Sequence, residues 1–139
     1  MTLTYAQAND EMNKVFKDAW DGTGYSAFYQ DVKDARDTSE NPWACIFIKH
    51  VRSSLSTLSG VVGTRTFTRY GLITIQIFTK IGNGLQESYT LAKTLSDSFE
   101  GNTTPGGVRF RDVRLNEVGR DGQFFQLNVV IEFEYDEIK

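Results

Sequence analysis

The residue types that most often carry catalysis or bind metals are scarce in this sequence. It contains one histidine, His50, and one cysteine, Cys45. Both fall in residues 43–51, whose alternation predicts a strand, so an odd spacing places the two side chains on opposite faces. This placement argues against a Cys–His catalytic dyad, and one histidine with one cysteine cannot build an ordinary zinc site.

The glycines and carboxylates add no recognisable active site. Gly60-x-x-Gly63 and Gly82-x-Gly84 lack the flanking residues of nucleotide- and phosphate-binding loops. The 18 acidic side chains are an ordinary number for a chain of 139 residues, and none forms an evident acid–base pair. The sequence therefore predicts a protein that is not an enzyme and that needs no cofactor or metal.

One alternative is a strand that binds nucleic acid. Arg65, Phe67, Arg69 and Tyr70 interleave basic and aromatic side chains, as grooves that follow a single strand do. The same alternation is typical of an ordinary amphipathic strand. A sequence pI of about 5.1 also argues against a dedicated nucleic-acid-binding protein.

Length and composition predict a single domain over residues 1–139. Such a chain can bury one two-layer core, and its contents of 40% hydrophobic and 24% charged residues are ordinary for globular proteins. No apolar run approaches the roughly 18 residues of a membrane span, and the first residues lack the pattern of a signal peptide. One cysteine excludes an internal disulfide, so we expect folding in the cytoplasm and no membrane partner.

Hydrophobic periodicity predicts two helices and five strands. The helices are expected over residues 4–20, with a capping-box spacing between Thr4 and Gln7, and over residues 85–99. The strands are expected over residues 25–32, 43–51, 65–80, 108–118 and 123–135. This order predicts an α+β fold, in which both helices cover one face of a largely antiparallel or mixed sheet of about four to five strands.

Residues 53–67, SSLSTLSGVVGTRTF, are unusual for a segment between two predicted strands. They are too polar and glycine-broken for a core helix, yet too apolar for an ordinary loop. Their Ser, Thr and Gly content allows a long β-hairpin arm that could bury aliphatic side chains on a partner. These side chains are Leu55, Leu58, Val61 and Val62. The alternative is a loop that folds back over its own sheet.

Charge is distributed unevenly along the chain. Residues 41–86 carry five basic and no acidic residues, whereas residues 87–139 carry ten acidic and six basic residues. A basic middle and an acidic end can complement another copy of the same chain. Local solvation of each segment would explain the same distribution.

Two blocks of sequence carry a recognisable order of elements. They are RYGLITIQIFTKIGNGLQESYTLAKTLSDSFEG (residues 69–101) and TPGGVRFRDVRLNEVGRDGQFFQLNVVIEFEYDE (residues 104–137). A strand leads through a G-x-G turn into a helix that ends at FEG, and a hairpin follows. This pattern resembles the small tail-terminator, or tail-completion, proteins of long-tailed bacteriophages (the U-like group). The likeness extends over most of the chain and includes no catalytic motif.

The resemblance implies a structural virion protein with an α+β fold. Proteins of this group form a hexameric ring that caps the tail tube, ends tail polymerisation and offers a surface to the head-side connector protein. Genomic DNA passes through the lumen of the ring without sequence-specific binding. The implied location is the head–tail junction of the virion, after assembly in the host cytoplasm. Alternatives are a head–tail connector or minor tail protein and, from another class, a small ligand-binding or enzymatic α+β domain.

A ring of identical subunits needs two unlike patches that meet between neighbours. We expect a basic residue of one subunit (Arg65, Arg69 or Lys80) to approach an acidic residue of the next (Glu132, Glu134 or Asp136). Exposed pairs of this kind contribute about 0.2–1 kcal/mol each, so they would set register more than affinity. The four aliphatic residues of the arm are the expected apolar contacts.

Overall fold

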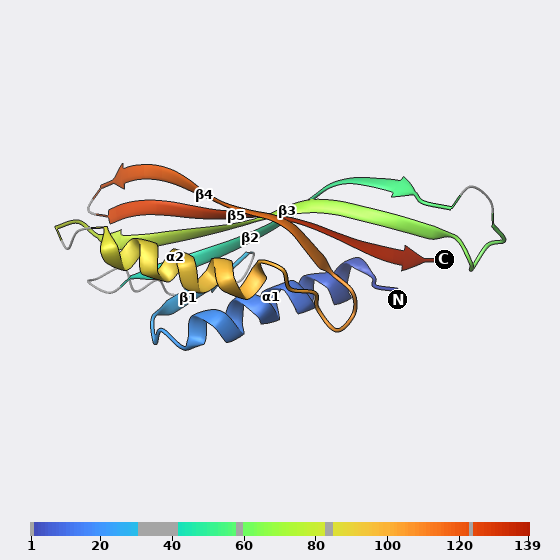
Figure 1. Ribbon diagram of the computed structural model, residues 1–139, viewed down its shortest axis with the longest axis horizontal. Helices are drawn as coiled ribbons and strands as arrows, with labels where there is room; N and C mark the ends of the chain where they lie inside the picture. The colour runs from blue at the N-terminus through green and yellow to red at the C-terminus, as the bar shows by residue number, and fades with distance from the viewer. Residues whose placement is uncertain (1, 31–41, 58–59, 83–84, 123) are drawn as a thin grey trace.

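The computed structural model describes residues 2–30, 42–57, 60–82, 85–122 and 124–139. The elements follow in the order α1 (Tyr5–Asp21), β1 (Ser26–Tyr29), β2 (Trp43–Leu55), β3 (Thr66–Lys80), α2 (Gln86–Phe99), β4 (Arg109–Asp121) and β5 (Phe124–Ile138). The strands form one sheet in the order β1-β2-β3-β5-β4. Only the β1–β2 pair is parallel among these described strands. The predicted α+β fold with a mixed sheet is confirmed, and both helices cover one face (Figure 1).

Helix α1 begins at the predicted capping box. The Gln7 backbone N–H donates to the Thr4 hydroxyl at 3.3 Å, and the Thr4 backbone N–H donates to the Gln7 side chain at 3.0 Å, which satisfies two otherwise unpaired donors. From there a stripe of apolar residues with a spacing of four lies fully buried against the sheet. Its members are Ala8, Met12, Phe16 and Trp20.

The core lies between the helices and one face of the sheet. Ile73, Ile75 and Ile77 of β3 alternate inward and pair directly with three aliphatic residues of β5. Every member of this group has no exposed surface: Ile73, Ile75, Ile77, Leu127, Val129 and Ile131. Burial of each such side chain stabilises the fold by about 1.5–3 kcal/mol, so this layer is the main source of stability.

Two of the three register shifts in the described strands lie on one line across the sheet, and the third is between Glu117 and Gly119 on β4. The register shifts between His50 and Arg52 on β2 and between Phe110 and Asp112 on β4. Between these bulges lies Gly71, where a Cβ would stand 2.3 Å from the carbonyl oxygen of Lys49 and 2.4 Å from the Phe133 ring. No larger residue fits this space without a shift of backbone. The line divides the sheet into a helix-covered body and an extension.

We call this extension the arm, and it comprises residues 51–57, 60–70 and 134–138. β2 continues four residues beyond its predicted end, so Ser53 to Leu55 pair with Arg69 to Phe67. The end of β5 pairs along β3 on the other side, and the arm projects beyond both helices (Figure 1). The predicted long hairpin arm is therefore present, built from three strands rather than two.

Candidate assembly surfaces

The described part of the arm tip is a defined turn that presents two valines. The backbone N–H and the hydroxyl of Thr64 donate to the Val61 carbonyl oxygen at 2.9 and 2.7 Å. Gly63 has φ +98°, a conformation that glycine adopts without strain. Val61 and Val62 are 76% and 79% exposed, which excludes the alternative that they fold back onto their own sheet. Leu58 lies outside the described residues.

A basic side chain lies beside this turn. The Arg65 guanidinium stands 5.8 Å from the centre of the Phe67 ring, and its Nε is buried without a hydrogen-bond partner in the part of the chain that the structure describes. Lys139 lies over the same ring at 5.3 Å. Leu55, paired with Phe67, is 51% exposed. The end of the arm therefore combines exposed apolar surface with positive charge.

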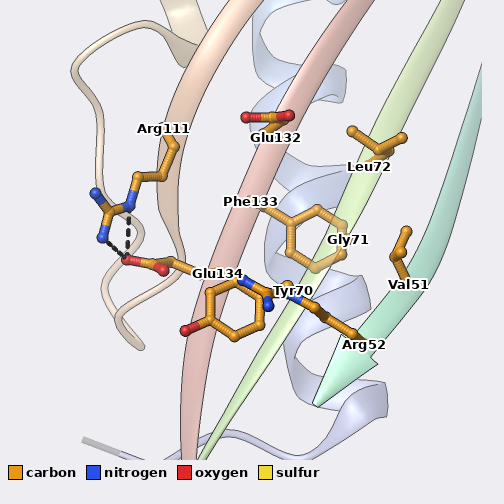
Figure 2. A pocket seen from close by; sticks show the side chains of 9 residues that line it. All are labelled: Val51, Arg52, Tyr70, Gly71, Leu72, Arg111, Glu132, Phe133 and Glu134. Atoms are coloured by element: carbon orange, nitrogen blue, oxygen red, sulfur yellow. Dashed lines mark hydrogen bonds and ion pairs between the residues drawn. The ribbon is translucent and has the colours of Figure 1, made fainter. Parts of the chain in front are cut away.

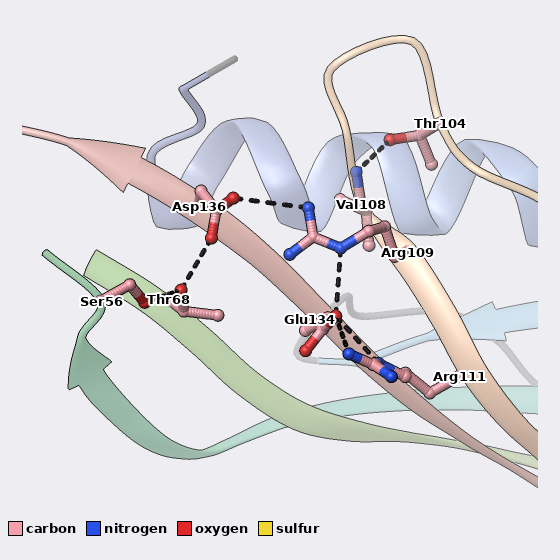
Figure 3. Close-up of polar contacts among 8 residues, drawn as sticks. All are labelled: Ser56, Thr68, Thr104, Val108, Arg109, Arg111, Glu134 and Asp136. Atoms are coloured by element: carbon pink, nitrogen blue, oxygen red, sulfur yellow. Dashed lines mark hydrogen bonds and ion pairs between the residues drawn. The ribbon is translucent and has the colours of Figure 1, made fainter. Parts of the chain in front are cut away.

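The acidic end of β5 is engaged within the subunit (Figure 3). Glu134 Oε1 accepts from Arg109 Nε at 3.1 Å and lies 2.8 Å from Arg111 Nη2. Asp136 accepts from the Thr68 hydroxyl at 2.8 Å and from Arg109 at 3.4 Å, and Thr68 also contacts the Ser56 hydroxyl. This network joins β4, β5 and β3 across the base of the arm.

Arg69 is also engaged within the subunit. Its side chain is 7% exposed, donates to Glu137 at 2.9 Å and lies 5.1 Å from the centre of the Tyr5 ring. The hydrogen bond to Glu137 raises the pKa of Arg69, so the guanidinium is permanently charged. Arg69, Glu134 and Asp136 thus have intrachain partners, which the charge pattern alone did not reveal.

The remaining predicted interface charges are placed differently. Glu132 has a half-exposed side chain, and its nearest described cation is Arg114 Nη1 at 3.8 Å. Arg65 has no ion pair among the described residues. Lys80 lies at the end of β3 opposite the arm, where it pairs with Phe124. The predicted contact between subunits stays a prediction, and Arg65 with Glu132 is the pair best placed for it.

A groove of about 470 Å³ lies on the sheet face opposite the helices, at the line of bulges (Figure 2). It is lined by Val51, Arg52, Tyr70, Gly71, Leu72, Arg111, Glu132, Phe133 and Glu134. Figure 2 shows Glu132 toward one end, and Arg52 toward the other, where its guanidinium lies 4.3 Å from the centre of the Tyr70 ring. Sequence reasoning missed this groove. The only signal was Gly71, because an isolated glycine in a strand often marks a close backbone approach.

His50 links the body to the arm beneath the start of α1. Its Nε2 lies 2.6 Å from the hydroxyl of Tyr135, and its ring meets Tyr5 edge to face at 5.0 Å between centres. Burial, helped by the charge of Arg69, lowers the pKa of His50. Burial also raises the pKa of Tyr135 to about 12. Both groups are therefore neutral at pH 7, and Cys45 lies on the other face, as the strand pattern predicts.

This geometry does not place the four residues of the nucleic-acid alternative on one continuous basic and aromatic surface. Because neighbouring strand residues face opposite sides, Tyr70 lies on the other face from Phe67 and Arg69. Arg69 is buried and paired, so it offers no charge to a phosphate.

Two further features of the described residues bear on function. They contain no group of three or more His, Cys, Asp or Glu side chains placed to hold a metal ion. In the same ranges, neither helix has the length and apolar character needed to cross a membrane.

No protein-family model matches this sequence, and no curated protein matches it. Solved structures do share the fold. One of them, a protein designated only by a sequence identifier, aligns with a TM-score of 0.64 at 13% sequence identity, over 91% of this chain and 94% of its own. At this identity the likeness shows the α+β fold alone.

Proposed function

We propose that this protein is a bacteriophage tail terminator that acts by assembly rather than by catalysis. The function itself is suggested by the resemblance of residues 69–101 and 104–137 to that group. The structural observation that supports it is the arm, which projects from a helix-covered body and ends in two exposed valines. Exposed apolar side chains on a projection are typical of an interaction site, and a subunit of an assembly can bury them on a partner.

In this proposal, copies of the chain form a ring, most simply a hexamer, at the head-proximal end of the tail. One side of the ring binds the last ring of tail tube protein and so ends polymerisation. The other side receives the head-side connector protein, and genomic DNA passes through the lumen without sequence-specific contacts. The protein resides at the head–tail junction of the virion after assembly in the host cytoplasm.

Tail length in the absence of the protein tests this proposal. Virions should be assembled without the chain and imaged by electron microscopy, with wild-type protein added back as the control. Tails of irregular, excessive length that the added protein corrects are the expected result. Tails of normal length that fail to join heads would instead identify a head–tail connector. Normal tails joined to heads would reject both structural roles.

The solution mass of the purified chain tests ring formation separately. A species near six subunits by native mass spectrometry is expected, either free or in the presence of tail tubes. A chain that stays monomeric under both conditions would favour the other class of function, a small ligand-binding domain that uses the groove.

A further inference from the structure

We infer that the groove on the far face of the sheet receives the arm tip of a second copy of this chain. This inference rests on the ring of the proposed function and assigns the two surfaces that would meet in it. Contact between an apolar projection and a pocket elsewhere on the same molecule is heterologous, which is the geometry that a ring requires.

One of the two surfaces projects and the other is hollow, and both offer apolar side chains. The turn at Val61–Thr64 is convex and held by two hydrogen bonds, so Val61 and Val62 are presented in a fixed arrangement. The groove is concave, and its volume of about 470 Å³ lies within the range of roughly 300–1,000 Å³ typical of binding pockets. Val51 and Leu72 provide apolar surface for the two valines.

The arm cannot fill the groove of its own subunit. The pairs from Arg52–Tyr70 to Leu55–Phe67 hold the hairpin extended, and the Ser56 N–H donates to the Thr66 carbonyl oxygen at 2.8 Å. Four steps along the strands at about 3.4 Å each place the turn some 14 Å or more beyond the groove. The occupant must therefore come from another chain.

Charge also favours a second copy. Arg65 follows the turn directly and has no described ion pair, whereas Glu132 on the groove has only a cation at 3.8 Å. The other groove carboxylate, Glu134, already contacts Arg109 and Arg111. Arg65 of the incoming arm can thus face Glu132 at the end of the groove distant from Arg52 (Figure 2).

A second exposed apolar surface is the alternative binding site for the arm. Exposed apolar residues also lie at the start of α2 and on β4, toward the end of the molecule opposite the arm: Leu85, Tyr89, Leu115 and Val118. Its carboxylate, Glu117, accepts a hydrogen bond from the Tyr89 hydroxyl at 2.8 Å. This surface serves as the control in the tests below.

Disulfide trapping tests the contact directly. The double variant Val62→Cys/Leu72→Cys should form covalent dimers and higher multimers under mild oxidation, because two chains bring the thiols together. Within one chain they lie far beyond the roughly 7 Å that a disulfide tolerates between Cα atoms. The native Cys45 is buried and does not interfere. The matched control, Val62→Cys/Val118→Cys, should stay unlinked. Cross-linking of the control alone, or of neither variant, would overturn the inference.

Charge reversal provides an independent measurement. Arg65→Glu and Glu132→Arg should each weaken self-association by about two- to fivefold, and the double reversal should restore it. Val62→Asp should weaken it at least about tenfold, since a carboxylate would be buried in the groove. Glu117→Arg is the control and should leave association unchanged.

The inference and the proposed function fail in distinguishable ways. If rings form and tails have normal length with Val62→Asp and Glu132→Arg, the groove contact is wrong and the terminator role stands. If Val62 and Leu72 cross-link but tails are normal without the protein, the contact stands and the terminator role is wrong.

Discussion

The helix-covered body and the arm belong to the same sheet, yet they are held together by different interactions. In the body, aliphatic side chains such as Ile75 and Val129 pair across strands and lie under two helices with no exposed surface. In the arm, the side chains that join the strands are mostly polar. Glu134 pairs with Arg109, and Asp136 accepts a hydrogen bond from the Thr68 hydroxyl. Arg69 pairs with Glu137.

This difference shows how one sheet can serve two purposes. Apolar burial is strong and non-directional, so it stabilises the body as a whole. Charged hydrogen bonds contribute less to stability but demand a particular geometry, so they fix the direction of the arm. Because the polar side chains hold the arm together, its exposed valines and Leu55 stay free for a partner.

The largest effect is expected from a cavity in the body. Ile75→Ala should lower the free energy of unfolding by about 2–5 kcal/mol, because it removes fully buried methyl groups between the sheet and the helices. Chemical denaturation checks this value. Leu55→Ala in the arm is the matched control and should change stability by less than about 0.5 kcal/mol. Equal losses for both would contradict the division into body and arm.

A smaller loss is expected at the boundary. Gly71→Ala should lower the free energy of unfolding by about 1–3 kcal/mol, because the added methyl group meets the Lys49 carbonyl oxygen and the Phe133 ring. Thermal unfolding measures the change. Gly22→Ala is the matched control, because an added Cβ there would meet only the Ala19 carbonyl oxygen, at an ordinary contact distance of 3.9 Å, and φ is −65°. A Gly71→Ala variant with the same free energy of unfolding as the wild type would mean that the boundary is not tightly packed.

Within the arm, Glu134→Gln should cost roughly 1–2 kcal/mol, since Arg109 and Arg111 lose their charged acceptor but remain partly in water. The loss should shrink at high salt, unlike that of Ile75→Ala. Hydrogen exchange of the Glu134→Gln variant should show faster opening of the end of β5 than of its centre. Uniform exchange along β5 would argue that the network does not hold the arm.

The smallest effect concerns pH. The pKa of His50 is lowered in the folded state, so the unfolded chain binds a proton more readily. The free energy of unfolding should therefore decrease as the pH is lowered below about 6.5. His50→Asn should remove this part of the pH dependence while leaving other acid effects in place. Denaturation midpoints at pH 7 and pH 5 provide the comparison. An unchanged slope in the variant would assign the dependence to other groups.

The body was predictable from sequence, whereas the arm was predictable only in outline. The spacing of Ala8 to Trp20 and the alternation of Ile73 to Ile77 report directly on burial. By contrast, Ser53 and Ser54 carry no apolar alternation, so the pattern placed the end of β2 four residues too early. Its continuation depends on pairing with β3.

The interface charges show the same limit. Charge counts identified Arg69 and Glu134 as candidates, but only strand register reveals that each meets a partner in its own chain. The groove depends on two bulges and one glycine from three strands. No single segment of sequence encodes it, so local patterns could not predict it.

The short parallel strand β1 has a consequence for the subunit before assembly. β1 covers β2 only from Trp43 to Ile46, so within the described residues the rest of β2 is a sheet edge. A flat edge of that length would invite other chains to add strands and aggregate. Here the Gln30 side chain accepts from the Ile48 N–H at 3.0 Å, and the bulge between His50 and Arg52 breaks the line of free backbone groups. The same irregularity that shapes the groove therefore protects the lone chain from uncontrolled strand addition.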